Sequence, residues 1–301
     1  MLTVFSIPKA FVGHIAVIQR NALGSWIRLG EGIQVILFGD DEGVAEAARE
    51  AGAEHVAEID RNEYGTPLLN SAFSTAARMG RNPLLCYVNG DMMFTDELTR
   101  AAALIRKRNF LMVGHRWNVD ITEPWDFSDP QWRKKLVAFT RDHGVRDIDY
   151  AIDYFVFPRH SKLTIQPPFA IGRSKWDNYL LFRCRQLGYP LINATAVITA
   201  VHQNHDYAHL PNGNPCIFGG PEADANKKLL GGEVRTFALF DATHRLTEFG
   251  LKKTRILPGW SRRELAAFHP RLLAALHPRI LKAIVAIKKI LRRLGFLQTR
   301  R

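Results

Sequence analysis

Apolar and polar positions alternate in blocks over the first 117 residues. Short apolar runs predict strands at 2–7, 33–39, 83–90 and 110–117, and the more polar segment 53–59 predicts a weaker strand. Between these runs apolar residues recur at helical spacing, which predicts helices at 14–29, 44–52, 68–80 and 95–108. Strands that alternate with helices in this way form right-handed βαβ units on a parallel sheet, with helices on both faces.

The second half of the chain is less regular. Residues 118–148 are rich in Trp, Asp and Pro and predict a long loop that contains a helix near 130–141. Further along, the pattern predicts a strand at 153–158, a helix at 174–188 and an extended segment at 190–201. The sequence therefore predicts an α/β fold whose first half is the more regular.

Ligands of parallel α/β sheets bind beyond the carboxyl ends of the strands. Three segments hold those positions here: Pro8-Lys9, Gly39-Asp40-Asp41 and Asn89-Gly90-Asp91. No G-x-G-x-x-G motif or P-loop follows any predicted strand, so the sequence does not support dinucleotide or P-loop chemistry.

Asp91 ends the buried strand of "YVNGDMMF", at residues 87–94. A lone carboxylate at this edge suits Mg²⁺ or Mn²⁺, which take one or two protein carboxylates together with substrate phosphates. The alternative is structural, because the same carboxylate can cap a helix that begins near Thr95 or Asp96.

Asp177 opens the helix of "GRSKWDNYLLF", and a carboxylate there can act as general base for a hydroxyl nucleophile. It can equally stabilise the helix dipole. Trp176 beside it is either a platform that stacks on a sugar or part of the core.

Two further groups of charged residues suit a nucleotide. Asp40 and Asp41 can accept hydrogen bonds from a base or ribose, or begin the next helix. Three cations suit contact with phosphate, and each can equally be a solvated surface charge: Lys9, Arg61 and Arg173.

Three histidines lie in "VITAVHQNHDYAHL", at 202, 205 and 209. On a helix this spacing would place all three imidazoles on one face, as in a zinc site. However, they follow an extended run, and the neighbouring Asn204, Asp206 and Pro211 favour a loop. We therefore expect His202 or His205 to complete a site with Asp91, with His202 slightly favoured and His209 excluded.

The net charge of +12 belongs to the end of the chain. Residues 251–301 hold 14 Lys/Arg and one acid, which leaves 27 basic and 28 acidic residues in 1–250. A nearly neutral body argues against nucleic acid as a partner.

Three cysteines without clustered spacing favour a reducing compartment. The sequence contains no apolar run of 18 residues, so it predicts no transmembrane helix.

The basic end contains the run "RILKAIVAIKKILRRLGF". One helical stripe contains Ile280, Ile284, Ile287, Leu291 and Leu294, and the other side contains Lys282, Lys289, Arg292 and Arg293. Such a basic amphipathic helix, over 279–297, is typical of one that lies in an anionic membrane interface. The alternative is a helix that packs its apolar stripe on the main domain.

Taken in order, several segments resemble nucleotide-diphospho-sugar transferases of the GT-A fold. They are "FSIPKAFVGHIAVIQRNALGSW", "VILFGDDEG", "NEYGTPLLNSAF", "YVNGDMMF", "PPFAIGRSKWDNYLL" and "AVHQNHDYAHL". The resemblance covers roughly residues 1–245. It implies a Rossmann-like, mainly parallel sheet with helices on both faces, here followed by the basic amphipathic C-terminal helix.

The resemblance also implies a function: transfer of a sugar from a UDP- or GDP-sugar to a hydroxyl of a glycan or glycolipid, assisted by Mn²⁺ or Mg²⁺. The family's D-x-D metal motif reads Asn89-Gly90-Asp91 here, so only its second Asp is present. The implied metal ligands are Asp91, His202 and His205. In inverting members the acid that opens this late helix acts as base, which implies Asp177, whereas in retaining members it does not, so the resemblance leaves the stereochemistry open. The implied donor-binding residues are Pro8, Lys9, Asp40, Asn62, Gly65, Asn89, Gly90, Asp91 and Arg173.

The expected organisation is a nucleotide-sugar half at 1–117, an acceptor and catalytic half at 118–245, and a basic tail at 246–301. Residues 202–226 are either a lid over the donor or an ordinary surface loop. We expect a cytoplasmic protein, peripheral on the inner membrane face. The other functions considered are a nucleotidyltransferase on a similar sheet and a non-catalytic, membrane-associated adaptor that uses the basic tail.

Overall fold

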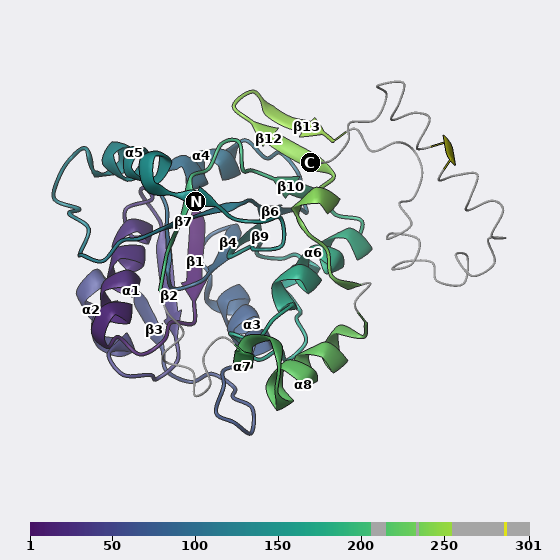
Figure 1. Cartoon of the computed structure of the whole chain (residues 1–301), viewed down its shortest axis with the longest axis horizontal. Helices are drawn as coiled ribbons and strands as arrows, with labels where there is room; N and C mark the ends of the chain where they lie inside the picture. Colours follow the sequence, from purple (N-terminus) through teal and green to yellow (C-terminus); the bar gives the residue numbers. More distant parts are fainter. Residues whose placement is uncertain (206–214, 233–234, 255–285, 288–301) are drawn as a thin grey trace. The chain divides into compact units, whose positions relative to one another are not determined.

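The computed structural model describes residues 1–205, 215–232, 235–254 and 286–287 (Figure 1). The chain divides into two compact units, Met1–Arg255 and Ile256–Arg301. Of the predicted helix at 279–297, only positions 286 and 287 are among the described residues. Within the described part, no helix combines the length and apolar character needed to cross a membrane.

The first unit alternates strands and helices up to α4. Its elements in this half are β1 (Leu2–Ser6), α1 (Gly13–Trp26), β2 (Gln34–Phe38), α2 (Val44–Ala51), β3 (Glu54–Val56), α3 (Leu69–Met79), β4 (Leu84–Val88), β5 (Met92–Met93) and α4 (Glu97–Ala103). The second half contains β6 (Leu111–Val113), β7 (Arg116–Val119), α5 (Trp132–His143), β8 (Val145–Arg146), β9 (Tyr154–Pro158), α6 (Trp176–Gln186), β10 (Leu191–Asn193), β11 (Ala200–Gln203), α7 (Pro215–Phe218), α8 (Pro221–Leu230), β12 (His244–Thr247) and β13 (Gly250–Lys253).

The strands of the large sheet follow the order β13-β12-β10-β6-β9-β4-β1-β2-β3. β1 lies parallel to β2 and β4, and β10 lies parallel to β6 and β12. The antiparallel strand β9 separates these two parallel groups, and β13 is antiparallel at the edge. The predicted α/β class with a mainly parallel sheet is confirmed.

The two faces of the large sheet have different cores. On one face, α1, α2 and α4 contribute Ala22, Ala47 and Ala101 to a largely aliphatic cluster. On the other face the contacts are aromatic: Phe5 of β1 packs on Phe73 of α3 at 5.1 Å between ring centroids. Both faces are therefore covered, which suits the fully apolar strands predicted from the sequence.

Trp176, at the start of α6, belongs to the aromatic core. It is buried and packs against Tyr87 and Phe155, with ring centroids at 5.3 and 5.4 Å. Of the two roles considered for Trp176, the structure favours the core over a sugar platform.

Two predicted strands are each broken into two. Residues 110–117 form β6 and β7, while 190–201 contain β10 and the start of β11. β6 and β10 pair in the large sheet, whereas β7 and β11 pair in a second sheet of order β5-β11-β7-β8. Both breaks adjoin Gly114, where an added β-carbon would collide with the Tyr154 hydroxyl and crowd Thr195.

The β12–β13 hairpin belongs to the compact unit Met1–Arg255. In this hairpin, buried Leu246 pairs with Leu251 and both join the aliphatic cluster. This pairing makes residues 246–253 part of the sheet.

Candidate functional site

The carboxyl ends of β1, β2 and β4 lie at the same edge of the large sheet, because these strands are parallel neighbours. The segments that follow them contain Lys9, Asp40 and Asn89, respectively. The topology therefore brings the three predicted ligand-binding segments to one edge, where α/β proteins bind their ligands.

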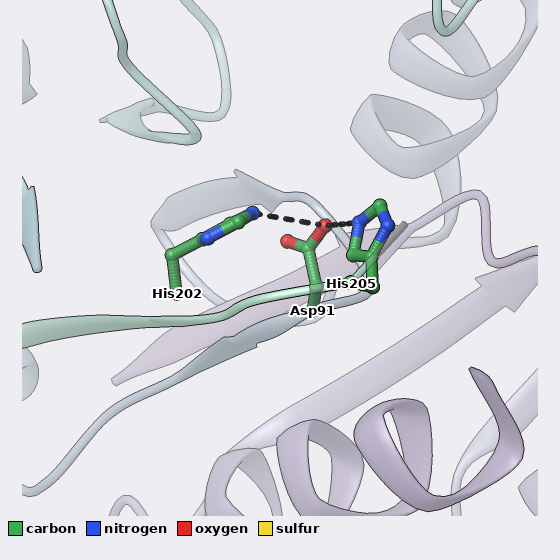
Figure 2. A group of neighbouring side chains, drawn as sticks. All are labelled: Asp91, His202 and His205. Atoms are coloured by element: carbon green, nitrogen blue, oxygen red, sulfur yellow. Dashed lines mark hydrogen bonds and ion pairs between the residues drawn. The ribbon is translucent and has the colours of Figure 1, made fainter. Parts of the chain in front are cut away.

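Asp91 lies in the turn between β4 and β5, facing two histidines from β11 and the residues after it (Figure 2). Its Oδ2 lies 3.6 Å from Nε2 of His202 and 3.2 Å from Nε2 of His205. One candidate ligand atom from each residue lies within 4.8 Å of the others. The three side chains thus converge on one point from segments more than a hundred residues apart in the chain.

Backbone pairing sets this convergence. β11 runs antiparallel to β5, with His202 opposite Met92. The next residue, Gln203, donates its backbone N–H to the carbonyl of Asp91 at 3.1 Å. The register of a single strand pair therefore fixes the distance between the carboxylate and the imidazoles.

Asp91 is held in its charged form. Burial would raise the pKa of its carboxyl group, but the charge and hydrogen bond of His202, followed by those of His205, hold the pKa well below its usual range. Two buried atoms at the centre, Oδ1 of Asp91 and Nδ1 of His202, have no hydrogen-bond partner in the described part of the chain. A charged carboxylate with an unpaired buried oxygen beside two imidazoles fits a divalent metal ion.

Buried polar residues on α1 hold the turn in place. Gln19 forms two hydrogen bonds with the backbone of Lys9, at 2.7 and 2.8 Å. Its Oε1 would lie 2.9 Å from a β-carbon at residue 90, so this close approach requires Gly90. The β1–α1 loop and the Asn89-Gly90-Asp91 turn are therefore packed against the same side chain.

Asn21, also on α1, takes part in a second connection to the Asp91 turn. Asn21 donates to the side chain of Gln203 at 3.0 Å, and Gln203 in turn donates to the carbonyl oxygens of Ile18 and Asp91. Sequence analysis did not single out these polar residues. Their signal in the sequence is weak, because Gln19 and Asn21 are two residues apart and therefore project from different sides of the helix.

Arg116 is the centre of a partly buried charge network, which sequence analysis also missed. Its guanidinium forms ion pairs with Asp147 and Asp153. Asn89 donates to the second of these carboxylates at 2.6 Å. Although burial lowers the pKa of Arg116, Asp153 and Asp147 outweigh burial and raise the pKa, so Arg116 stays charged. The network thereby joins β7 to the Asn89-Gly90-Asp91 turn.

Asp177 lies in the first turn of α6, and its environment is the opposite of that around Asp91. Burial, with a smaller contribution from Asp153, raises the pKa of its carboxyl group to about 7. Its Oδ1 is buried and makes no hydrogen bond with any residue the structure describes. Lys175, two residues earlier, has φ +81°, an unusual value for a residue with a side chain. The backbone is therefore strained where the chain enters α6, next to this carboxylate.

The remaining predicted donor residues form a second group around two arginines. Arg61 pairs with Asp40 and Asp41 and donates to the carbonyl of Gly65 at 2.7 Å. Asn62 donates to Glu222 of α8 at 2.7 Å, and Glu222 also pairs with Arg173. Asp40, Asn62, Gly65 and Arg173 are thus linked to one another through Arg61 and Glu222.

The other residues predicted from the sequence lie in the β1–α1 loop, in α7 and α8, or outside the described residues. Pro8 precedes Lys9 in the β1–α1 loop, at the carboxyl end of β1. His209 lies outside the described residues, as do residues 206–214 of the segment considered as a lid. The described end of that segment forms α7 and the start of α8. α8 is held by Asn226, which exchanges two hydrogen bonds with the backbone of Ala170.

A cavity of about 500 Å³ opens beside the Arg116 network. It is lined by His115, Asp147, Ile148, Asp149, Tyr150 and Phe240. Tyr150 and Phe240 meet edge to face at 5.4 Å between ring centroids. Asn178, which follows Asp177, donates to the carbonyl of Tyr150 at 3.3 Å. The wall of the cavity is therefore tied to the helix turn that contains Asp177.

No protein-family profile and no curated protein matches the chain. Among solved structures, the chain is similar to glucosyl-3-phosphoglycerate synthase from Mycobacterium tuberculosis in complex with Mg²⁺ and uridine diphosphate. That match has 14% sequence identity and a TM-score of 0.41, and covers 68% of this chain and 72% of the other.

Two further structures extend this comparison. A complex of the same synthase with Mn²⁺, uridine diphosphate and glucosyl-3-phosphoglycerate has 13% identity, a TM-score of 0.41 and the same coverage, 68% and 72%. The chain is also similar to residues 1–349 of S. aureus TarS, with 12% identity and a TM-score of 0.40. That match covers 67% of this chain and 57% of the other.

Proposed function

We propose that this protein is a metal-dependent glycosyltransferase that moves a sugar from a nucleotide-diphosphate donor to an acceptor hydroxyl. The observation that supports it most is the convergence of Asp91, His202 and His205 at the carboxyl edge of the sheet. The predicted donor-binding segments end at the same edge.

The three ligands favour a transition metal over Mg²⁺. Mg²⁺ prefers oxygen ligands and keeps several of its waters, whereas two imidazole nitrogens suit a transition metal. Among transition metals we propose Mn²⁺. Asp91, His202 and His205 would hold the ion, and when bound it would neutralise charge on the diphosphate leaving group. On the protein's side, Gln203 and Gly90 fix the turn that presents the carboxylate.

Asp177 is the proposed general base. A pKa of about 7 leaves a substantial fraction of this carboxylate charged at neutral pH while keeping it basic enough to accept a proton. The acceptor hydroxyl gives its proton to Asp177 as its oxygen bonds to the anomeric carbon. The bond from that carbon to the diphosphate oxygen breaks in the same step.

The cavity whose wall is hydrogen-bonded to Asn178, the neighbour of Asp177, is the proposed acceptor site. Tyr150 and Phe240 offer aromatic surface, while Asp147 and Asp149 offer hydrogen-bond acceptors for hydroxyl groups. This lining suits a hydroxyl-rich, uncharged acceptor, and the carboxylates disfavour an anionic one. We therefore propose the neutral sugar units of a glycan or glycolipid as acceptor.

The location follows from the chain's basic end. A basic amphipathic helix over residues 279–297 would place the protein on the inner face of a membrane, in the cytoplasm. This setting suits a glycolipid or a glycan that grows at the membrane surface.

A thermal-shift screen of UDP-, GDP- and dTDP-sugars, with and without Mn²⁺, tests the donor site. A ligand that binds only the folded protein raises its melting temperature. We expect one nucleotide class to stabilise the protein in the presence of Mn²⁺, with His205→Ala abolishing the effect and the exposed His160→Ala retaining it. Absence of any response to all three donors would overturn the proposal.

Product analysis separates this function from its closest alternative. A glycosyltransferase, even without acceptor, releases a nucleoside diphosphate by hydrolysis of its donor. A nucleotidyltransferase instead forms or cleaves the bond at the α-phosphate and exchanges labelled pyrophosphate into a nucleoside triphosphate. Detection of that exchange, dependent on Asp91, would reassign the chain.

A further inference from the structure

The β12–β13 hairpin forms the edge of the large sheet, beyond β10 (Figure 1). Leu246 and Leu251 face the aliphatic core, so the alternate pair Arg245 and Lys252 faces outward, and both residues are exposed. These two cations lie directly opposite each other across the strands. Like charges in this arrangement destabilise a hairpin, because their β-carbons are only about 5 Å apart.

The neighbouring pair is also basic on both strands. Lys253 lies opposite His244. Burial, followed by the positive charges of Lys107, Lys253 and Arg185, lowers the pKa of His244 below its usual value. Basic residues from three separate segments therefore gather around the start of β12.

Strand register explains why the loop before β6 belongs to the same surface. Ile192 of β10 pairs with Met112 of β6 on one side and with His244 of β12 on the other. Since these three strands are parallel, the residues that precede β6 and β12 lie at the same end of the sheet. Residues 106–108, Arg-Lys-Arg, come just before β6 and are all exposed.

We define the basic edge as Arg106, Lys107, Arg108, Arg245, Lys252 and Lys253. No carboxylate of the described chain forms an ion pair with any of these six residues, in contrast to Arg61, Arg116 and Arg173. Glu248 is the one acidic residue in 242–254, and 104–112 contain none. The basic edge is therefore a local concentration of charge on a body that is nearly neutral as a whole.

An apolar side chain lies at the hairpin tip. Phe249 is 84% exposed, and Leu104, two residues before Arg106, is 40% exposed. The four residues of β12 span about 13 Å, so the tip and the basic edge fall within one contact area. A cationic surface with an exposed aromatic ring suits the boundary between lipid headgroups and acyl chains.

We propose that the basic edge and Phe249 form a surface that binds an anionic lipid bilayer. The partner is identified by charge complementarity for the six cations and by insertion of an apolar ring for Phe249. This surface is made of residues of the unit Met1–Arg255 and includes none of residues 279–297. A single weak contact binds a membrane only marginally and reversibly, whereas two contacts together give stable attachment.

Sedimentation of the full chain with vesicles tests the proposal. Vesicles of phosphatidylcholine alone are compared with vesicles that contain phosphatidylglycerol in equal part. The variant R245Q/K252Q/K253Q should bind the anionic vesicles about 100-fold more weakly than the unaltered chain, since each cation near such a surface contributes roughly fivefold. The effect should shrink at high salt, which screens exposed charges.

The matched control is R49Q/R78Q/K134Q, which removes the same net charge from exposed helix positions elsewhere. It should retain most of the binding. Both variants keep residues 256–301, so the basic tail contributes equally to each. Equal binding of the two triple variants would overturn the proposal, because net charge alone would then account for the attraction.

Phe249 distinguishes a bilayer from another polyanion. F249S should weaken vesicle binding without any change in charge, and the fluorescence of F249W should shift to shorter wavelength when anionic vesicles are added. Undiminished binding by F249S would overturn insertion. Preferential binding of a DNA or RNA oligonucleotide that depends on the same cations would also overturn the lipid assignment.

These outcomes are separable from the proposed enzyme activity. None of the altered residues lies at the metal centre, at Asp177 or in the cavity. Donor hydrolysis in solution should therefore stay unchanged in every variant of this surface. Loss of vesicle binding with normal hydrolysis supports the surface, whereas failure of all donors to bind would concern the enzyme alone.

Discussion

Asp91 and Asp177 are two buried carboxylates on which the molecule imposes opposite states. Two imidazoles surround Asp91 and hold its pKa well below the usual range, despite burial that acts in the other direction. Around Asp177 burial outweighs the backbone hydrogen bonds and the charge of Arg116, and raises its pKa to about 7. Burial alone therefore does not decide the charge of a carboxylate, and the side chains placed next to it do.

The difference suggests a separate role for each carboxylate. A carboxylate that stays charged at every physiological pH suits a metal ligand, while one that gains and loses a proton near neutrality suits a general base. Substituting each Asp by Asn removes the charge with little change in shape. The same substitution at the two positions should consequently have different effects.

The largest effect is expected from Asp91→Asn. The charge that the metal site relies on is lost, so sugar transfer should fall on the order of 10⁴-fold. Steady-state kinetics measures the loss, and titration with Mn²⁺ should show the metal affinity falling with it. Normal metal affinity in this variant would assign the ion to other residues.

Asp177→Asn should lower kcat by about 10³-fold while leaving Mn²⁺ and donor binding intact, because only the proton acceptor is removed. In the unaltered enzyme, kcat should rise with pH through about 7 as Asp177 loses its proton. A pH profile measured on both proteins should show this rise only in the unaltered one. A profile unchanged by the substitution would exclude Asp177 as the base.

Stability should change in opposite directions at the two positions. Since the folded pKa of Asp177 is raised, the folded protein keeps a proton that the unfolded chain loses between about pH 4 and pH 7, and stability falls across this range. At pH 8, Asp177→Asn should raise the free energy of unfolding by roughly 2–4 kcal/mol, and near pH 4 the gain should vanish.

Asp91→Asn provides the comparison in the same experiment. The lowered pKa of Asp91 adds stability above the unfolded pKa, and that stability disappears as the pH falls through the folded value. At pH 8 this substitution should therefore destabilise the protein. Urea titrations of metal-free protein at both pH values measure the effects, and changes of the same sign at pH 8 would contradict the comparison.

The smallest effect is expected from Gly90→Ala. The new β-carbon would lie 2.9 Å from Gln19 Oε1 and displace the turn that presents Asp91, so Mn²⁺ affinity should fall about tenfold. In the Gln19→Ala background the same substitution should cost less, because the obstructing atom is gone. Equal losses in both backgrounds would show that Gln19 does not position the turn.

Sequence patterns predicted the first half of the fold and part of the site. Five short strand-like runs alternate with segments whose apolar residues have helical spacing. This pattern is enough to predict the alternation of strands and helices up to α4, because the periodicity of each element depends only on neighbouring residues. Asp91 and Asp177 could be singled out because both adjoin the boundary of a predicted element. A carboxylate at such a boundary is visible without any knowledge of tertiary contacts.

Other features depend on contacts between distant residues and were not predictable. The breaks between β6 and β7 and between β10 and β11 lie where Gly114 meets Tyr154 and Thr195, which are distant from it in the sequence. The importance of Arg116 arises from Asp147 and Asp153, about thirty residues further on. Both histidines approach Asp91 only because β11 pairs with β5.

The two broken strands have a consequence for how the centre can move. β6 continues into β7, which bears Arg116, and β10 leads to β11, which bears His202. As β7 and β11 are also paired, a tilt of the small sheet about residues 114 and 194–199 would displace both side chains together. β5 belongs to the same small sheet, so Asp91 in the turn before it would move with them, and the candidate metal centre would shift as one piece relative to the large sheet.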